Sequence, residues 1–190
     1  KPEQAMVLFN LKSQEADFLA DQNVRKALLM GINRQWIVDR ILNSQAIVAD
    51  GPIFPGTWAY YEGLKRQEYD PDGARSLLVE AGFGLEEGAT VRAKEGAELA
   101  FTLLYPDDDS HLAVAEALKK YWGDLNVQVD LEGVPYEQLV SERLQNRTYQ
   151  AALVDLNFTR SPDPDPYPFW DSVQATNGQN YTQWNQKVAS

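Results

Sequence analysis

The chain has 190 residues, 44% of them hydrophobic and 24% charged, which suits one globular core or at most two small ones. Its formal net charge of −11, without a basic stripe to neutralise phosphates, argues against nucleic acid and anionic membrane surfaces as partners. Cysteine is absent and His111 is the single histidine. The Cys–His and Ser–His pairs used in covalent catalysis are therefore ruled out or reduced to one possible base.

The N-terminal part predicts one strand and two helices. Residues 1–10, KPEQAMVLFN, have too short an apolar run for a signal peptide, and residues 6–11 are typical of a strand buried on both faces. Asp21 and Asn33 are suited to cap two successive helices, the second over residues 34–42. No apolar run approaches the ~20 residues of a membrane span.

A proline-rich segment, AIVADGPIFPGTWAYYEG, separates these helices from a third. We predict that this segment is a loop held down by its aromatic side chains. Asp70 followed by Pro71 combines a capping side chain with proline at the first helical position, and Gly82 is suited to end the helix that they begin. Residues 83–98 are rich in Gly and Glu and predict a surface hairpin or loop.

The second half of the chain alternates strands with helices. Apolar periodicity predicts strands over residues 99–105, 126–131 and 151–158, and helices over residues 110–125 and from Pro135 onward. The order β-α-β-α-β predicts right-handed crossovers and helices packed on a central sheet. We therefore expect one α/β domain over residues 1–190, with a central mixed sheet flanked by helices.

Residues 149–170, YQAALVDLNFTRSPDPDPYPFW, are the stretch most suited to hold a binding site. The apolar run of residues 151–158 predicts a central strand, and the prolines that follow exclude regular pairing. Ligands of α/β proteins bind at the ends of strands and in the loops after them. The sequence therefore predicts a recognition surface where this strand ends.

Acidic residues in and after this strand are the first candidates. Asp155 lies in an otherwise apolar strand, where a carboxylate needs a cation or hydrogen-bond donors. It could hold a ligand ammonium group, pair with a nearby Arg or Lys, or lie on a solvated face. Asp163 and Asp165 flank Pro164, but the alternating oxygen ligands and central glycine of a calcium loop are absent, which favours a turn.

Aromatic and polar side chains complete the candidate set. Phe158, Trp170 and Tyr181 could form walls of a pocket, or could belong to the core. Arg160 could pair with a ligand carboxylate in a bidentate manner, or could face solvent. Asn180 could contact a ligand or fix a turn. For His111, which follows an acidic turn at the start of a helix, a capping or surface role is favoured over catalysis.

Several stretches, in order, resemble the C-terminal lobe of the extracellular solute-binding proteins of ABC importers, family five, which includes dipeptide- and oligopeptide-binding proteins. They are FLADQNVRKALLMGINRQWIVDRIL, GPIFPGTWAYYEGLKRQEYDPDGARSLLVEAGF, LAFTLLYPDDDSHLAVAEALKKYWGDLNVQVDLEGVPYEQL, DPDPYPFW and GQNYTQW. The resemblance implies one lobe of a type II periplasmic-binding-protein-like fold, with the N-terminal lobe absent from this chain.

The resemblance also implies a function without catalysis, cofactor or metal. Such a protein captures an oligopeptide or other small solute between two lobes by hinge closure and delivers it to the permease subunits of the importer. Its expected location is the periplasm or the outer face of the bacterial membrane, with membrane contact only through the permease or a lipid anchor of the parent protein. The ligand-binding candidates are Asp155, Phe158, Arg160, Asp163, Asp165, Trp170, Asn180 and Tyr181.

One departure from the family pattern leaves the ligand open. Peptide-binding members carry an Asp just before the Asp-Pro loop, and it pairs with the α-amino group of the ligand. Residues 159–162 read here as an insertion, so that Asp155 lies earlier on the strand and Asp163 and Asp165 lie later. Peptide is the first expectation, with a sugar, a nickel complex or another solute as alternatives.

Two other functions compete with solute binding. A glycoside hydrolase could use two of the carboxylates of Asp155, Asp163 and Asp165 beside an aromatic sugar platform, if they lie about 5–10 Å apart. A purely structural or partner-docking domain is the third possibility.

Overall fold

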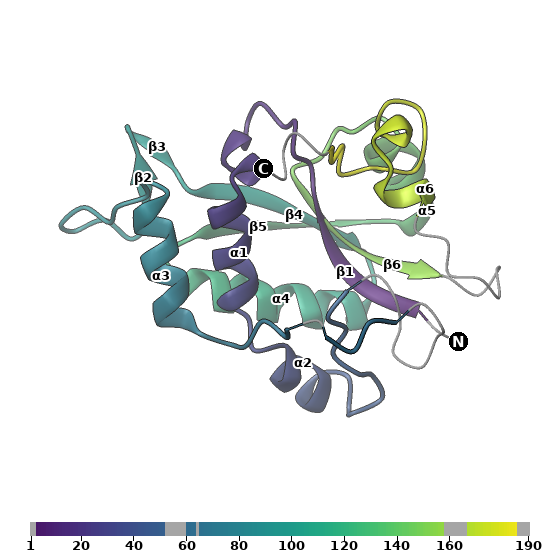
Figure 1. The fold of residues 1–190 in the computed structure, drawn as a ribbon, viewed down its shortest axis with the longest axis horizontal. Helices are drawn as coiled ribbons and strands as arrows, with labels where there is room; N and C mark the ends of the chain where they lie inside the picture. The colour runs from purple at the N-terminus through teal and green to yellow at the C-terminus, as the bar shows by residue number, and fades with distance from the viewer. Residues whose placement is uncertain (1–2, 52–59, 64, 158–166, 186–190) are drawn as a thin grey trace.

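Four strands form the central sheet of a computed structural model, which describes residues 3–51, 60–63, 65–157 and 167–185 (Figure 1). The strands are β1 (Glu3–Phe9), β4 (Ala100–Pro106), β5 (Gln128–Val134) and β6 (Ala151–Asn157), in the spatial order β1-β6-β4-β5. β4 is parallel to both β5 and β6, and β1 pairs antiparallel with β6. The predicted mixed sheet is therefore confirmed.

Strand β1 is less buried than the sequence predicts. It is an edge strand that ends at Phe9, and only Leu8 is fully buried, while Val7 and Phe9 are half-buried. Leu8 contributes to one core cluster, and Val7 and Phe9 pack against the other, so both faces do meet apolar side chains. Asn10 leaves the strand pattern because its side-chain amide donates hydrogen bonds to the carbonyls of Arg147 and Tyr149.

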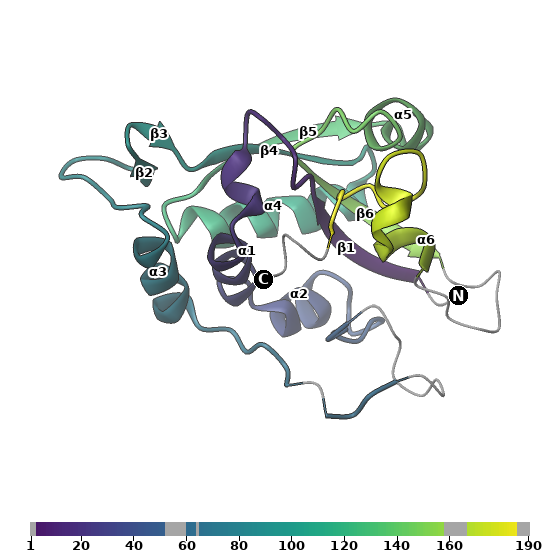
Figure 2. The ribbon, with the colours of Figure 1, turned by 45° about the horizontal axis from the view of Figure 1, so that its top comes forward.

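The helices begin where capping residues stand in the sequence. Asp21, Asn33 and Asp70 accept hydrogen bonds from the first turns of α1 (Gln22–Met30), α2 (Arg34–Arg40) and α3 (Pro71–Glu80). α4 (Asp109–Gly123) is capped by Asp108. Figures 1 and 2 show α1 and α4 on one side of the sheet, and α5 and α6 on the other.

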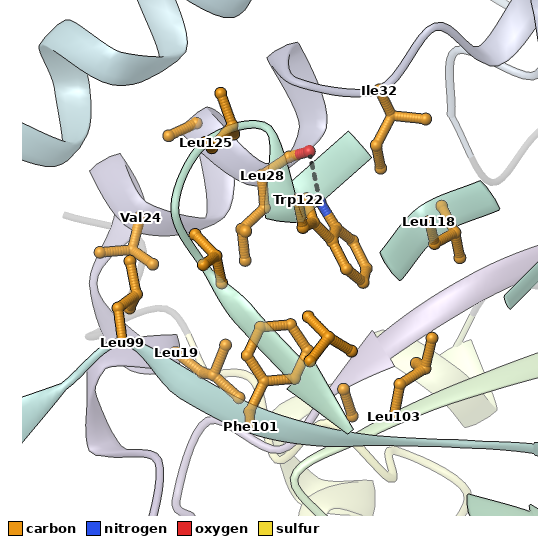
Figure 3. Close-up of a cluster of buried hydrophobic side chains, with 14 of the residues drawn as sticks. Leu19, Val24, Leu28, Ile32, Leu99, Phe101, Leu103, Leu118, Trp122 and Leu125 are labelled. Carbon is orange, nitrogen blue, oxygen red and sulfur yellow. Dashed lines mark hydrogen bonds between the residues drawn. The ribbon is translucent and has the colours of Figure 1, made fainter. Parts of the chain in front are cut away.

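The larger core cluster lies between the sheet and α1, α3 and α4 (Figure 3). Its centre is the indole of Trp122, whose ring centroid lies 5.4 Å from that of Phe101 and 6.4 Å from that of Phe9. The labelled members are Leu19, Val24, Leu28, Ile32, Leu99, Phe101, Leu103, Leu118, Trp122 and Leu125. This cluster packs η1 (Asp17–Ala20) and helices α1 to α4 against the parallel strands β4, β5 and β6.

A smaller cluster covers the opposite face of the sheet. It forms under α5 (Tyr136–Gln138) and the π-helix η2 (Leu139–Leu144), where the sequence predicts a regular helix from Pro135. The wider π turns bring Leu139 and Leu144 to the same buried side, five residues apart. Tyr136, in the first turn, is 52% exposed and does not join this buried face.

The remaining described elements are short. Strands β2 (Ala93–Lys94) and β3 (Ala97–Glu98) form the hairpin predicted within residues 83–98, with positive φ at both Glu95 and Gly96 in the tight turn. α6 (Tyr167–Trp170) and η3 (Ser172–Ala175) follow β6 on the side of the smaller cluster. Within the described ranges, no helix is both long and apolar enough to span a membrane.

Candidate functional site

The carboxyl ends of the parallel strands meet at one edge of the sheet, which we call the carboxyl edge. β4 runs there into Asp107 and Asp108 at the start of α4, and β6 brings Asp155. β1, antiparallel to β6, begins at the same edge, where Ala5 pairs with Asp155. In parallel α/β sheets this is the edge that carries ligands.

Asp155 is bound to the only histidine of the chain. Oδ2 of Asp155 lies 3.1 Å from Nε2 of His111, and Nδ1 of the same ring lies 2.6 Å from Oδ2 of Asp108. The His111 side chain is 20% exposed, and those of Asp155 and Asp108 are 32% and 50% exposed. Asp155 thus has a basic partner, as one of the three sequence hypotheses required, but this partner is neither Arg nor Lys.

The N-terminus of α4 fixes the charge of Asp108. Burial raises the pKa of its carboxyl group, but the backbone N–H and the ring of His111, together with the N–H of Ser110, outweigh that effect. The net pKa of Asp108 is lowered, because all three partners stabilise the carboxylate form. Asp108 therefore stays ionised to a lower pH than a free aspartate side chain would.

A polar cluster fixes the base of the proline-rich segment beside the start of α2. Arg34 donates to the carbonyls of Ala49 and Gln67, and Nε of Arg66 lies 3.1 Å from both carboxylate oxygens of Asp50. Desolvation lowers the pKa of Arg34, and the nearby charge of Asp50 opposes that effect. Residues 49–51, in the first part of the segment, and residues 66–67, just after it, are thereby tied together, and we call these residues the base of the segment.

The start of β1 is bonded to this base. The side-chain amide of Gln4 donates a hydrogen bond of 3.1 Å to the carbonyl of Gly51. Gln4 is next to Ala5, the pairing partner of Asp155. The base of the proline-rich segment therefore lies close to the carboxyl edge.

Part of the predicted site lies outside the described residues. Phe158, Arg160, Asp163 and Asp165 belong to residues 158–166, so their roles stay predictions. Trp58, a candidate anchor of the proline-rich segment, is also outside the described ranges.

Trp170 lies on the other face of β6 from Asp155. It is half-buried at the end of α6 and packs against the smaller core cluster, to which Val154 and Leu156 belong. Because alternate side chains of a strand point to opposite faces, Asp155 points away from that cluster. The structure thus does not bring Trp170 and Asp155 together on one surface.

Asn180 and Tyr181 lie near the amino end of β6. Asn180 is completely buried, and its amide donates to the carbonyls of Asp171 and Trp184. The Tyr181 carbonyl accepts a hydrogen bond of 2.7 Å from the hydroxyl of Tyr149, two residues before β6. Asn180 and Tyr181 are therefore at the opposite end of β6 from Asp155. The hydrogen bonds of Asn180 fix a turn, which is one of the two roles that the sequence left open.

A recess of about 500 Å³ near the amino ends of β4 and β6 had no counterpart among the sequence-based predictions. Its walls include Thr102, Glu132, Arg143 and Arg147. Arg143 donates to both carboxylate oxygens of Glu132, and the guanidinium of Arg147 donates to backbone carbonyls. Because these charges are already bound within the protein, we place the candidate site at the carboxyl edge instead.

Sequence reasoning underestimated His111. Its contact with Asp108, three residues earlier, was detectable from helix spacing. Its contact with Asp155 joins residues 44 positions apart, and it depends on how α4 packs beside β6. No local pattern reveals such a contact.

Comparisons with known proteins agree with this architecture. The sequence model described as bacterial extracellular solute-binding proteins, family 5 Middle, matches residues 1–180. The oligopeptide-binding protein AppA of Bacillus subtilis is 27% identical over 176 residues, covering 89% of this chain and 32% of AppA. Protein XP55 of Streptomyces lividans is 32% identical over 165 residues, covering 84% of this chain and 29% of that protein.

Solved structures show the same fold. AppA from B. subtilis, in complex with a nonapeptide, superposes with a TM-score of 0.88 at 24% identity, covering 98% of this chain and 37% of that one. NikZ from Campylobacter jejuni, in complex with Ni(L-His), superposes with a TM-score of 0.85 at 26% identity, covering 97% and 36%. The chain thus spans about a third of the length of the relatives it matches.

Proposed function

Because the chain belongs to family 5 of the bacterial extracellular solute-binding proteins, we propose that it forms one ligand-binding lobe of an ABC-importer binding protein. The observation that carries this proposal is the family match over residues 1–180, supported by the shared fold. AppA is an oligopeptide-binding protein and NikZ is seen in complex with Ni(L-His), which favours a role without catalysis over the glycoside hydrolase alternative.

The carboxyl edge is the proposed ligand-facing surface. Asp155, the acidic start of α4 and the base of the proline-rich segment all lie at this end of the sheet. Residues 158–166, with Phe158, Arg160, Asp163 and Asp165, extend directly from this edge in the sequence. Trp170 belongs to the proposed site only as packing support for β6, since it lies on the opposite face.

A second lobe, in the part of a parent protein that this chain does not span, would form the opposite wall. A ligand held by one wall alone leaves much of its surface in water, and small-molecule sites usually bury most of the ligand. Closure of two lobes about a hinge supplies the missing burial, and permease subunits would recognise the closed form. We therefore expect weak binding by the 190 residues alone.

Peptide is the proposed ligand class, with a nickel complex as second candidate. AppA is an oligopeptide-binding protein, and the NikZ structure holds Ni(L-His). The net charge of −11 and the acids of the carboxyl edge favour a ligand with a cationic group, such as a peptide α-amino group. The proposed location is the periplasm or the outer face of the bacterial membrane, as for the family.

Isothermal titration calorimetry on the full-length parent, stripped of ligand, tests the proposal. A panel of di- to nonapeptides and nickel–histidine are the probes, and mass spectrometry identifies any solute that copurifies. We expect one peptide class to bind in the nanomolar to micromolar range, and the 190-residue chain to bind it at least 100-fold more weakly. Absence of binding to every probe, or tight binding by the isolated chain, would contradict the proposal.

A matched pair of variants locates the site. Asp155→Asn removes a charge at the carboxyl edge, and Asp130→Asn removes one from an exposed position of β5. We expect Asp155→Asn to weaken peptide binding about 10-fold, the usual scale for a charged hydrogen bond, and Asp130→Asn to leave it unchanged. Equal effects of the two variants would move the site away from the carboxyl edge.

A further inference from the structure

The imidazole ring of His111 joins two elements that are distant in the sequence. Nδ1 contacts Asp108 at 2.6 Å, within the first turn of α4, and Nε2 contacts Asp155 at 3.1 Å, in the carboxyl half of β6. Both separations are those of hydrogen bonds. The ring therefore bridges a helix on one face of the sheet and a central strand.

The two contacts need two donors on the ring. A carboxylate oxygen can only accept, whereas a neutral imidazole has one N–H donor and one bare nitrogen. Both contacts are hydrogen bonds together only when the ring carries protons on Nδ1 and Nε2. If the ring gives one proton to water, one carboxylate faces a nitrogen lone pair, and that contact turns repulsive.

Asp108 is the partner that keeps the remaining proton. It is the shorter contact, and it lies on the same helical turn as His111. The Asp108 carboxylate is also fixed by the backbone N–H groups of Ser110 and His111, each at 3.0 Å. Asp155 has no comparable anchor among the described residues, since His111 provides its only charged contact there. Loss of a proton therefore breaks the bond to Asp155.

The surrounding charges are acidic. The turn before α4 carries Asp107, and α4 itself begins with Asp109. The last titratable side chain of β4 is Tyr105. In β1, which pairs with the strand of Asp155, residues 4–9 have no titratable side chain. Among the charged groups of these neighbouring elements, only Asp108 and Asp155 contact the ring in the part of the chain that the structure describes.

We propose that His111 is a proton-dependent clasp, which ties the carboxyl half of β6 to α4 and releases Asp155 when the ring becomes neutral. The bond to Asp155 exists only while both ring nitrogens carry protons, because a carboxylate oxygen can only accept. While the ring is doubly protonated, Asp155 is occupied by His111, and once the ring is neutral the Asp155 carboxylate can take another cation. The clasp belongs to the chain itself and does not depend on solute binding.

Nitrogen-15 NMR of the ring tests the clasp directly, because a chain with one histidine gives one pair of ring signals when any tag lacks histidine. We expect both ring nitrogens to be protonated at the acidic end of a pH titration. At the alkaline end we expect the Nδ1–H tautomer, with a bare Nε2. A ring that ends as the Nε2–H tautomer would overturn the proposal.

The release of Asp155 has its own readout. The backbone amide signals of Val154, Asp155 and Leu156 should shift with the same midpoint as the ring, and His111→Gln should abolish that shift. In Asp108→Asn, which keeps the helix cap because Asn caps as well as Asp, the neutral ring should change to the Nε2–H tautomer. Amide signals of β6 that do not follow the ring, or an unchanged tautomer in Asp108→Asn, would refute the clasp.

Discussion

The indole Nε1–H of Trp122 donates a buried hydrogen bond of 3.0 Å to the backbone carbonyl of Leu28 (Figure 3). Trp122 belongs to α4 and Leu28 to α1, so one bond joins two helices that lie 94 residues apart in sequence. The Leu28 carbonyl is within the last turn of α1, where helix carbonyls lack partners in their own helix. The indole thus satisfies a buried acceptor while its ring fills the centre of the core.

Trp122→Phe should destabilise the protein by about 2–4 kcal/mol, because it leaves the Leu28 carbonyl unpaired and opens space in the core. Urea unfolding followed by circular dichroism measures the change. Trp36→Phe is the matched control, since Trp36 is 45% exposed, and it should cost less than about 1 kcal/mol. Similar losses in both variants would show that the buried indole and its hydrogen bond contribute no more to the free energy of unfolding than an exposed indole does.

Gly31 should tolerate no side chain, although its backbone conformation is ordinary. A Cβ atom there would lie 2.5 Å from Cδ1 of the buried Leu125, where α1 ends against the residues that follow α4. We expect Gly31→Ala to cost about 1–3 kcal/mol from overpacking. Gly123→Ala, at the end of α4, has no atom within 4 Å of the new Cβ and should be neutral or stabilising by up to about 1 kcal/mol. Thermal denaturation of both variants checks the opposite signs.

Tyr149 should make the protein sensitive to alkali. Burial raises the pKa of its hydroxyl, which also donates to the Tyr181 carbonyl, so folding favours the protonated form. A pKa that folding raises adds stability below the unfolded value of about 10, and this stability is lost as pH rises above it. Urea midpoints of the wild type should therefore fall as the pH rises from about 10 upward.

Tyr149→Phe separates this effect from other alkaline titrations. The variant should be less stable at neutral pH by about 1 kcal/mol, the usual value of one hydrogen bond, but it should lose less stability above about pH 10. Tyr69→Phe, at a position 45% exposed, should show the same alkaline loss as the wild type. Parallel pH curves for the wild type and Tyr149→Phe would rule out the role of Tyr149.

The features that the sequence predicts well are local ones. The caps at Asp21, Asn33 and Asp70 each accept hydrogen bonds from backbone groups two or three residues away, so a short window contains all the participants. The π turns of η2 escape such reading, because they depend on burying Leu139 and Leu144 against the sheet.

The candidate site shows the same division more sharply. Asp155 is identifiable from sequence as an acid within an apolar strand, but its partner His111 is set by packing of α4 against the sheet. In the sequence, Tyr181 follows β6 by only about two dozen residues and groups with the residues after that strand. In the structure it contacts Tyr149 near the amino end of β6. Phe158, Arg160, Asp163 and Asp165 stay predictions.

The paired ends of the proline-rich segment have an evolutionary consequence. Arg66 and Asp50 meet across 16 residues, and Arg34 holds both sides of the junction from α2. Because the entropy cost of closing a chain segment grows only slowly with its length, the sequence between Asp50 and Arg66 could be exchanged or lengthened at little cost in folding stability. The protein thus offers a position beside its carboxyl edge where sequence could be exchanged while the sheet stays the same.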